Sequence, residues 1–180
     1  MTNAEQLTAW VASKHEGQTI KRTEEPYFSH VAAVAALAKP AVTFGYEIGL
    51  CHDLLEDTKT TKAELWATLL KFGYDTREAN LITAAVVELT DIYTSDNYPD
   101  WSKKERKDKE STRLMSVSPA AQTVKYGDLI YNIDWMLKYD QKHAKKYLLK
   151  KKLLLQGMDK GDEELREKAL GVIAEGLNNF

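Results

Sequence analysis

The chain has 180 residues, of which 43% are hydrophobic and 29% are charged, and its formal net charge at pH 7 is −2. This length allows one domain with a substantial core, and the small net charge argues against nucleic acid or an anionic membrane as a partner. The single cysteine, Cys51, excludes an intrachain disulfide and favours a reducing compartment, so we expect a cytoplasmic location. The amphipathic N-terminal segment lacks the apolar core of a signal peptide, and no run approaches the ~18 apolar residues of a membrane span.

Helix start and stop signals along the chain predict an all-α fold. Capping patterns occur at Thr61–Glu64, Asp75–Glu78 and Ser102–Glu105, and Ser118–Pro119 is typical of a helix start. In chain order, we expect helices near residues 3–15, 27–39, 43–57, 62–72, 76–91, 102–115, 119–138, 140–156 and 162–178. Residues 92–100 have loop composition. Since no strand pattern or linker is present, we expect a single domain over residues 1–180 with eight or nine helices.

Two charged runs and two histidines need an interpretation. Residues 103–110, KKERKDKE, have mixed sign and favour a solvated helix face. Residues 142–155, KHAKKYLLKKKLLL, are basic on one side and apolar on the other. This pattern favours a helix packed on the core, with a helix that faces a partner or an anion as the alternative. His15 and His143 match no motif and are expected at the surface.

The stretch GLCHDLLEDT, residues 49–58, concentrates ionisable side chains after an apolar lead-in. On a continuous helix, His52 and Glu56 share one stripe, and Asp53 and Asp57 share the next. Like charges one turn apart repel, and buried carboxylates lose their hydration. A divalent cation would make the arrangement tolerable. The alternative is an exposed acidic helix end beside a buried histidine.

Two further residues favour the metal interpretation. His30 lies in PYFSHVAAVAALA and Asp128 lies in VKYGDLIYNI, both apolar helical runs. A lone histidine there is also compatible with a core residue, whereas a carboxylate needs a cation or a hydrogen-bond network. With His52 and Asp53 they would form a mixed nitrogen and oxygen site, which suits Mn, Fe, Co, Ni or Zn better than Ca or Mg. Four protein ligands leave room for water and substrate on an octahedral ion.

The order His30, His52–Asp53, Asp128 resembles that of the HD-domain metal-dependent phosphohydrolases. The segments EPYFSHVAAVA, LCHDLLEDT, VVELTD and VKYGDLIYNI, within roughly residues 20–140, are similar to the hydrolase domain of RelA/SpoT-type proteins and to small alarmone hydrolases. The resemblance implies an all-α HD-type domain. It also implies hydrolysis of the 3′-pyrophosphate of (p)ppGpp, the alarmone of the stringent response, to GDP or GTP and pyrophosphate. The implied cofactor is Mn²⁺ or another divalent transition metal.

The same resemblance implies a role for nine residues. The metal would be held by His30, His52, Asp53 and Asp128. Water activation and proton transfer would fall to Glu56 and Asp57. The nucleotide would be contacted by Lys21, Arg22 and Asn132, with solvated loop charges as the alternative for the two basic residues.

Departures from the family pattern affect the substrate more than the reaction. Val31 replaces a proline, Leu129 replaces a basic residue, and Asp134, followed by Trp135, replaces an arginine. Two alternatives therefore stay open. One is an HD-type phosphohydrolase acting on another nucleotide, such as the 2′-phosphate of NADPH or a nucleoside monophosphate. The other is a catalytically idle nucleotide-binding module. The expected partner is a small nucleotide, and a homo-oligomer is compatible with the sequence.

Overall fold

The computed structural model describes residues 1–180, and every regular element in it is a helix. The ten helices are α1 (Asn3–Lys14), α2 (Phe28–Ala38), α3 (Gly45–Cys51), α4 (Leu54–Asp57), α5 (Lys62–Lys71), α6 (Thr76–Leu89), α7 (Lys103–Leu114), α8 (Pro119–Tyr139), α9 (Gln141–Gly157) and α10 (Glu163–Leu177). One isolated antiparallel bridge joins Thr19 and Pro26. The predicted all-α class is confirmed, and each expected segment contains helix.

Local capping explains where several helices begin. Thr61, Asp75, Ser102 and Ser118 each accept a hydrogen bond from the amide three residues later. Reciprocal capping boxes form at Asp75 and Ser102. The carboxylate of Glu64 instead pairs with an α1 lysine at 2.7 Å, so this side chain links two helices.

The predicted continuous helix over residues 43–57 is wrong, because the backbone turns between α3 and α4 at His52 and Asp53. The ring nitrogen Nδ1 of His52 lies 2.7 Å from the carbonyl oxygen of Gly49. In an uninterrupted helix that oxygen would accept from the amide of Asp53. A side chain that competes for a backbone acceptor in this way is a local reason for a helix to end. The turn directs two consecutive polar side chains to the same side.

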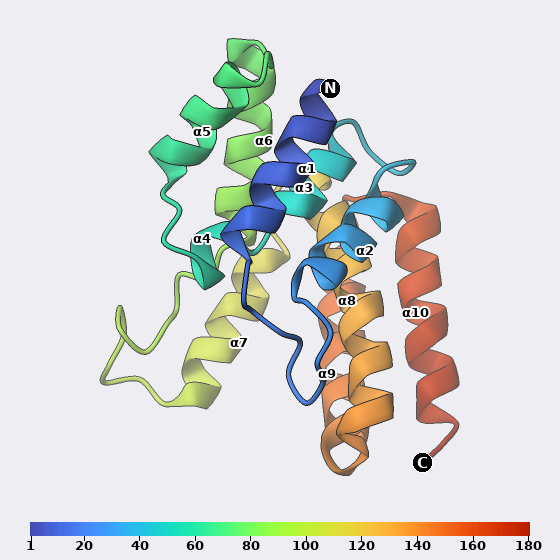
Figure 1. The fold of residues 1–180 in the computed structure, drawn as a ribbon. Coiled ribbons are helices and arrows are strands. Elements are labelled where there is room, and N and C mark those ends of the chain that lie inside the picture. Colours follow the sequence, from blue (N-terminus) through green and yellow to red (C-terminus); the bar gives the residue numbers. More distant parts are fainter.

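Helix α8 forms the central support of the molecule (Figure 1). It packs against α2, α3, α6, α9 and α10. Helices α5 and α6 pair at the upper left of Figure 1, away from the C-terminus, and α7 contacts α9. A continuous core of 32 buried residues runs through this assembly.

Close packing brings α3 against α2. A Cβ atom at Gly49 would lie 2.6 Å from the Cα atom of Ala35, closer than two carbon atoms can approach. Glycine at this position therefore permits α2 and α3 to touch. The contact sets the separation between His30, which lies on α2, and His52, which directly follows α3. No helix combines the length and the apolar character that a membrane crossing requires.

Candidate active site

Three parts of the fold bring the four predicted metal ligands together. His30 comes from α2, His52 and Asp53 from the turn between α3 and α4, and Asp128 from α8. Nε2 of His52 lies 3.0 Å from Oδ2 of Asp53 and 3.7 Å from Oδ1 of Asp128. Nε2 of His30 lies 3.3 Å and 3.4 Å from the same two oxygen atoms. Two ring nitrogens and two carboxylate oxygens thus point at one centre.

The protonation and spacing of these atoms fit a divalent cation. A carbonyl oxygen can only accept, so Nδ1 of His52 carries the proton that it shares with Gly49, and Nε2 is the nitrogen that can offer a lone pair to a metal ion in exchange for a proton. This Nε2 is buried and makes no hydrogen bond. Neighbouring ligands of an octahedral ion with bonds of about 2.1 Å lie about 3 Å apart, close to the separations seen here. One ligand atom each from His30, His52 and Asp53 lies within 4.8 Å of the other two.

The electrostatics of the cluster favour positive charge at its centre. Burial by itself would lower the pKa of His52, but Asp53 and Asp128 raise it to about 10. Burial likewise opposes the charge on His30, and the same carboxylates raise its pKa. Burial would raise the pKa of Asp53, but the histidines hold it well below its usual range. A group of atoms that binds protons this readily also favours a cation.

Neighbouring side chains fix the orientation of the two carboxylates. The hydroxyl of Tyr27 donates to Oδ2 of Asp53 at 2.6 Å. Burial and the charge of Asp53 raise the pKa of Tyr27, so its hydroxyl remains a donor. Nζ of Lys125 lies 2.7 Å from Oδ2 of Asp128, and the amide of Asn132 donates to Oδ1 of Asp128 at 2.6 Å. Such outer partners hold ligand atoms in place.

A cavity of about 410 Å³ opens above the cluster. Lys125, Asp128, Asn132 and Trp135 all line it, and their spacing of three, four and three residues places them on one stripe of α8. Since a helix rises 1.5 Å per residue, this stripe extends for about 15 Å. The cavity is therefore elongated along α8, with the cluster of two histidines and two aspartates between its ends.

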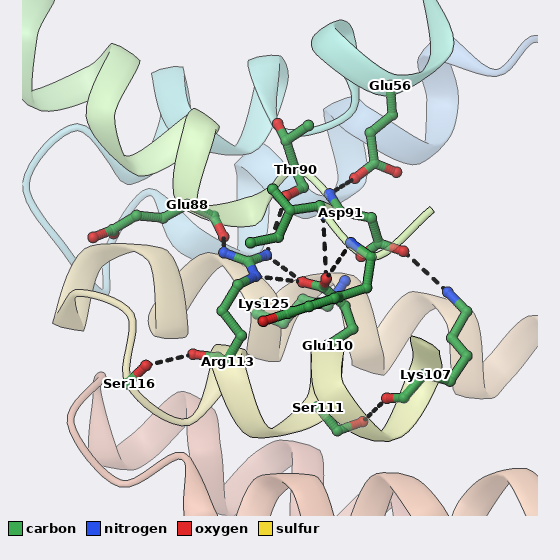
Figure 2. Close-up of polar contacts among 12 residues, drawn as sticks. Glu56, Glu88, Thr90, Asp91, Lys107, Glu110, Ser111, Arg113, Ser116 and Lys125 are labelled. Carbon is green, nitrogen blue, oxygen red and sulfur yellow. Dashed lines mark hydrogen bonds and ion pairs between the residues drawn. The ribbon is translucent and has the colours of Figure 1, made fainter. Parts of the chain in front are cut away.

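Glu56 and Asp57 of α4 line the same cavity. The carboxylate of Glu56 accepts a hydrogen bond from the amide of Asp91 (Figure 2). Partial burial raises the pKa of Glu56 to about 7, against the effect of that bond and with the help of the negative charges of Asp91 and Asp53. Burial and Asp53 also raise the pKa of Asp57. The pKa of each carboxyl group therefore lies above its ordinary value, and that of Glu56 lies near neutral pH.

A buried ion pair holds the segment that carries Asp91 (Figure 2). Glu110 of α7 is 4% exposed and pairs with Arg113. Its carboxylate accepts from the two amides that follow Asp91, at 3.2 Å and 3.3 Å. Arg113 donates to the carbonyl oxygens of Glu88 and Thr90 at 2.7 Å and 3.1 Å. The position of Glu56 therefore depends on α7 through Asp91.

The three predicted nucleotide contacts occupy different places. Lys21 and Asn132 line the cavity, whereas Arg22 does not. Arg22 has a positive φ of 65°, donates to the carbonyl oxygen of Tyr139, and lies over the ring of Trp135 with its guanidinium carbon 5.7 Å from the ring centroid. The indole of Trp135 in turn donates to the backbone oxygen of Lys21 at 2.9 Å. Arg22 thus braces the loop that presents Lys21.

The residues that depart from the pattern of the resembled family lie in different parts of the structure. Leu129 is buried at 1% exposure and Val31 is fully buried, so both belong to the core. Asp134 is exposed and does not line the cavity. Trp135 does line it. Of these positions, only Trp135 alters the wall that a ligand would meet.

Two surface expectations need correction. His15 is buried at 2% exposure, with Nδ1 2.7 Å from Oε1 of Gln18 and its ring centroid 5.2 Å from that of Tyr27. His143 is exposed, as expected. The run KKERKDKE is only partly solvated, because Glu110 is buried and Lys107 lines the cavity. The expectation of a wholly solvated face missed the acid that Arg113 pairs with.

Sequence reasoning also missed the cavity lysines other than Lys21: Lys107, Lys125 and Lys151. A signal existed for Lys125, which lies three residues before Asp128 on an apolar helix and so shares its face. No local pattern distinguishes Lys151 from the lysines on either side of it. Its place in the cavity follows from the packing of α9 on α8.

No family model and no curated relative matches the chain. Among solved structures, a similar fold is that of a metazoan ortholog of SpoT, which hydrolyzes ppGpp and plays a role in starvation responses. The two chains share 21% sequence identity over 98% of this chain and 97% of that chain, with a TM-score of 0.77. The chain therefore has the fold of this SpoT ortholog over nearly its whole length, as the sequence resemblance implied.

Proposed function

We propose that this chain is a divalent-metal-dependent hydrolase that removes the 3′-pyrophosphate of ppGpp and pppGpp, giving GDP or GTP and pyrophosphate. The observation that carries the proposal is the convergence of two histidines and two aspartates beneath a cavity that also holds a carboxylate pair. The shared fold with a protein that hydrolyzes ppGpp supports it. Cys51 is the one cysteine and is buried, which is consistent with action in the cytoplasm.

We assign the metal to His30, His52, Asp53 and Asp128. Their mixed nitrogen and oxygen donors favour Mn²⁺ or another transition metal over Ca²⁺ or Mg²⁺. When bound, such an ion supplies positive charge that polarises a phosphoryl oxygen and lowers the pKa of water. Tyr27 and Lys125 would keep the two aspartate carboxylates oriented, since each holds one of them by a short contact.

We assign proton transfer to Glu56 and Asp57. Water attacks the phosphorus that is bonded to the ribose 3′ oxygen, and the bond between this phosphorus and the 3′ oxygen breaks. Glu56, with a pKa of about 7, accepts the proton that the water loses. Asp57, the second carboxyl group in the cavity, returns a proton to the 3′ oxygen. The products are then pyrophosphate and a nucleoside 5′-diphosphate or 5′-triphosphate.

The opposite end of the cavity from Lys125 suits the nucleoside. Trp135 offers an aromatic wall there, and Lys21 offers a cation beside it. A purine stacks on such a wall, and stacking on an aromatic side chain contributes about 1–3 kcal/mol per base. Asn132 lies between this end and Asp128, within reach of a ribose hydroxyl.

The test is product analysis on a nucleotide panel. Metal-free protein is incubated with and without Mn²⁺ and with ppGpp, pppGpp, NADPH or deoxynucleoside monophosphates, and the products are resolved by chromatography. We expect Mn²⁺-dependent formation of GDP or GTP with an equal amount of pyrophosphate. Cleavage of NADPH or a monophosphate while ppGpp stays intact would replace this proposal with one of the alternative phosphohydrolases. Binding of ppGpp without turnover of any substrate would support the idle module.

A further inference from the structure

The cavity has a second cationic end, formed by lysines from three helices. Lys107 of α7, Lys125 of α8 and Lys151 of α9 all line it. Lys125 is at the amino-terminal end of the α8 stripe, whereas Trp135 is at the carboxyl-terminal end. Helix α9 follows α8 after a turn at Asp140 and packs back along it. This return brings Lys151 level with the part of α8 that carries Lys125 and Asp128.

The charges at this end are unevenly paired. Lys107 lies 3.0 Å from Oδ2 of Asp91 (Figure 2), and Lys125 lies 2.7 Å from Asp128. Glu110, a third acid at this end of the cavity, forms an ion pair with Arg113 of its own helix. Lys151 makes no ion pair and no hydrogen bond, although the charges of Asp128 and Asp91 act on it from a distance. Its Nζ lies 5.2 Å from the ring centroid of Tyr147.

Such a lysine is costly to the fold. Lys151 is half-buried, whereas Lys150 and Lys152 beside it are exposed. Burial, with repulsion from Lys125, lowers the pKa of Lys151 to about 8. An ammonium group that has lost part of its hydration without gaining an ion pair weakens folding. The same group can bind an anion that enters the cavity at a lower cost, because part of its dehydration has already occurred.

We infer that Lys151, with Lys125 and Lys107 beside it, is a binding subsite for a phosphate group of the substrate other than the one that water attacks. The inference rests on the proposed function for the identity of that substrate. Two groups of ppGpp have this chemistry: the outer phosphate of the 3′-pyrophosphate and the phosphates on the 5′ oxygen. A nucleotide with phosphate at two positions would then span the cavity, with its base towards Trp135.

The first experiment uses inorganic pyrophosphate as the probe. Its binding to metal-loaded protein is measured by calorimetry for wild type, Lys151→Met and Lys150→Met. We expect Lys151→Met to weaken binding about tenfold or more, because a charge-assisted contact is lost. Lys150→Met, one position away on the same helix and exposed, should stay within about twofold. Lys151→Arg should retain most of the affinity, since it keeps the charge.

Thermal unfolding separates this inference from a structural role. Methionine fills the space of the lysine stem without an unpaired charge, so Lys151→Met should unfold at the same or a higher temperature than wild type. Unchanged affinity for pyrophosphate in Lys151→Met would overturn the inference. The inference would also be overturned if Lys151→Met unfolded at a lower temperature than wild type and Lys150→Met lost as much affinity for pyrophosphate as Lys151→Met.

Kinetics then identify which phosphate is bound. The comparison uses ppGpp and guanosine 3′-diphosphate, which lacks the 5′ phosphates. A rise in KM for both substrates in Lys151→Met assigns the outer 3′ phosphate, and a rise for ppGpp alone assigns the 5′ phosphates. If wild type leaves ppGpp intact, the proposed function fails, whereas the pyrophosphate titration still decides whether the subsite exists.

Discussion

The two walls of the cavity are built by different forces. The wall that carries the four predicted metal ligands consists of α2, the turn after α3, and α8, which pack through apolar side chains and a glycine contact. The opposite wall, α7 with the segment before it, is richly charged, and only two residues of α7 are buried, Glu110 and Leu114. On this wall the ion pair between Glu110 and Arg113 holds the backbone in place, as apolar packing does on the first wall.

The two walls should differ in how far the positions of their side chains can change. Apolar packing holds atoms closely and tolerates little change in volume, which suits ligands whose separations must match one ion. The α7 wall presents Lys107 and, through Asp91, positions Glu56. Its geometry depends on a few polar contacts, so single substitutions should move it without unfolding the core.

The largest effect is expected from a substitution on the wall that carries the four predicted metal ligands. Asp53→Ala removes an oxygen that faces both histidines, so metal content should fall and turnover should drop on the order of 10³-fold or more. Mn²⁺ should raise the unfolding temperature of wild type by mass action and have little effect on the variant. Elemental analysis and thermal scans check this. Asp134→Ala, an exposed acid on α8, is the control. Equal metal content in Asp53→Ala and wild type would contradict the assignment.

A smaller loss is expected from Glu56, which joins the two walls. Glu56→Gln keeps the shape and the hydrogen-bond acceptor of the side chain but removes the base, so kcat should fall about 10²-fold while metal content stays the same. Asp57→Asn should behave similarly. Steady-state kinetics and elemental analysis on the same samples check this. Near-normal kcat in both variants would remove the carboxylate pair from the mechanism.

The pH profile should report the same group. Glu56 must be ionised to accept a proton, and its pKa is about 7. Below that value its protonated fraction increases, so kcat/KM should fall by about fivefold from pH 7 to pH 6, and by about tenfold for each further pH unit, if this ionisation limits the rate. Glu56→Gln should lack this acidic limb and retain only a flat, low rate. A limb that persists unchanged in the variant belongs to another group.

The smallest effect on turnover is expected from the α7 wall. Glu110→Gln leaves the half-buried Arg113 beside a neutral partner, which should destabilise the protein by about 2–3 kcal/mol. Because Asp91 then holds Glu56 less firmly, kcat should fall about fivefold at unchanged metal content. Asp108→Asn, on the same helix in an exposed pair with Lys104, should change stability by less than about 0.5 kcal/mol. Denaturant unfolding and kinetics together check this, and loss of metal in Glu110→Gln would show that the walls are not independent.

Most of the fold was predictable because its signals are local. Apolar spacing and caps such as Asp75 and Ser102 act within one or two turns of a helix, and the expected segments all contain helix. The turn at His52 and Asp53 was not predicted. It involves a bond from a ring nitrogen to the carbonyl oxygen of Gly49, which a count of apolar positions does not register.

For the site, the sequence was enough to predict which histidines and carboxylates would come together, because a carboxylate or a histidine in an apolar helix needs a partner wherever the helix packs. The positions of the basic side chains depend on tertiary packing. Arg22 turned away to α8, His15 became buried, and Lys151 reached the cavity without forming an ion pair. Each outcome depends on neighbours far along the chain, and a charged side chain carries no local sign of which neighbour it will meet.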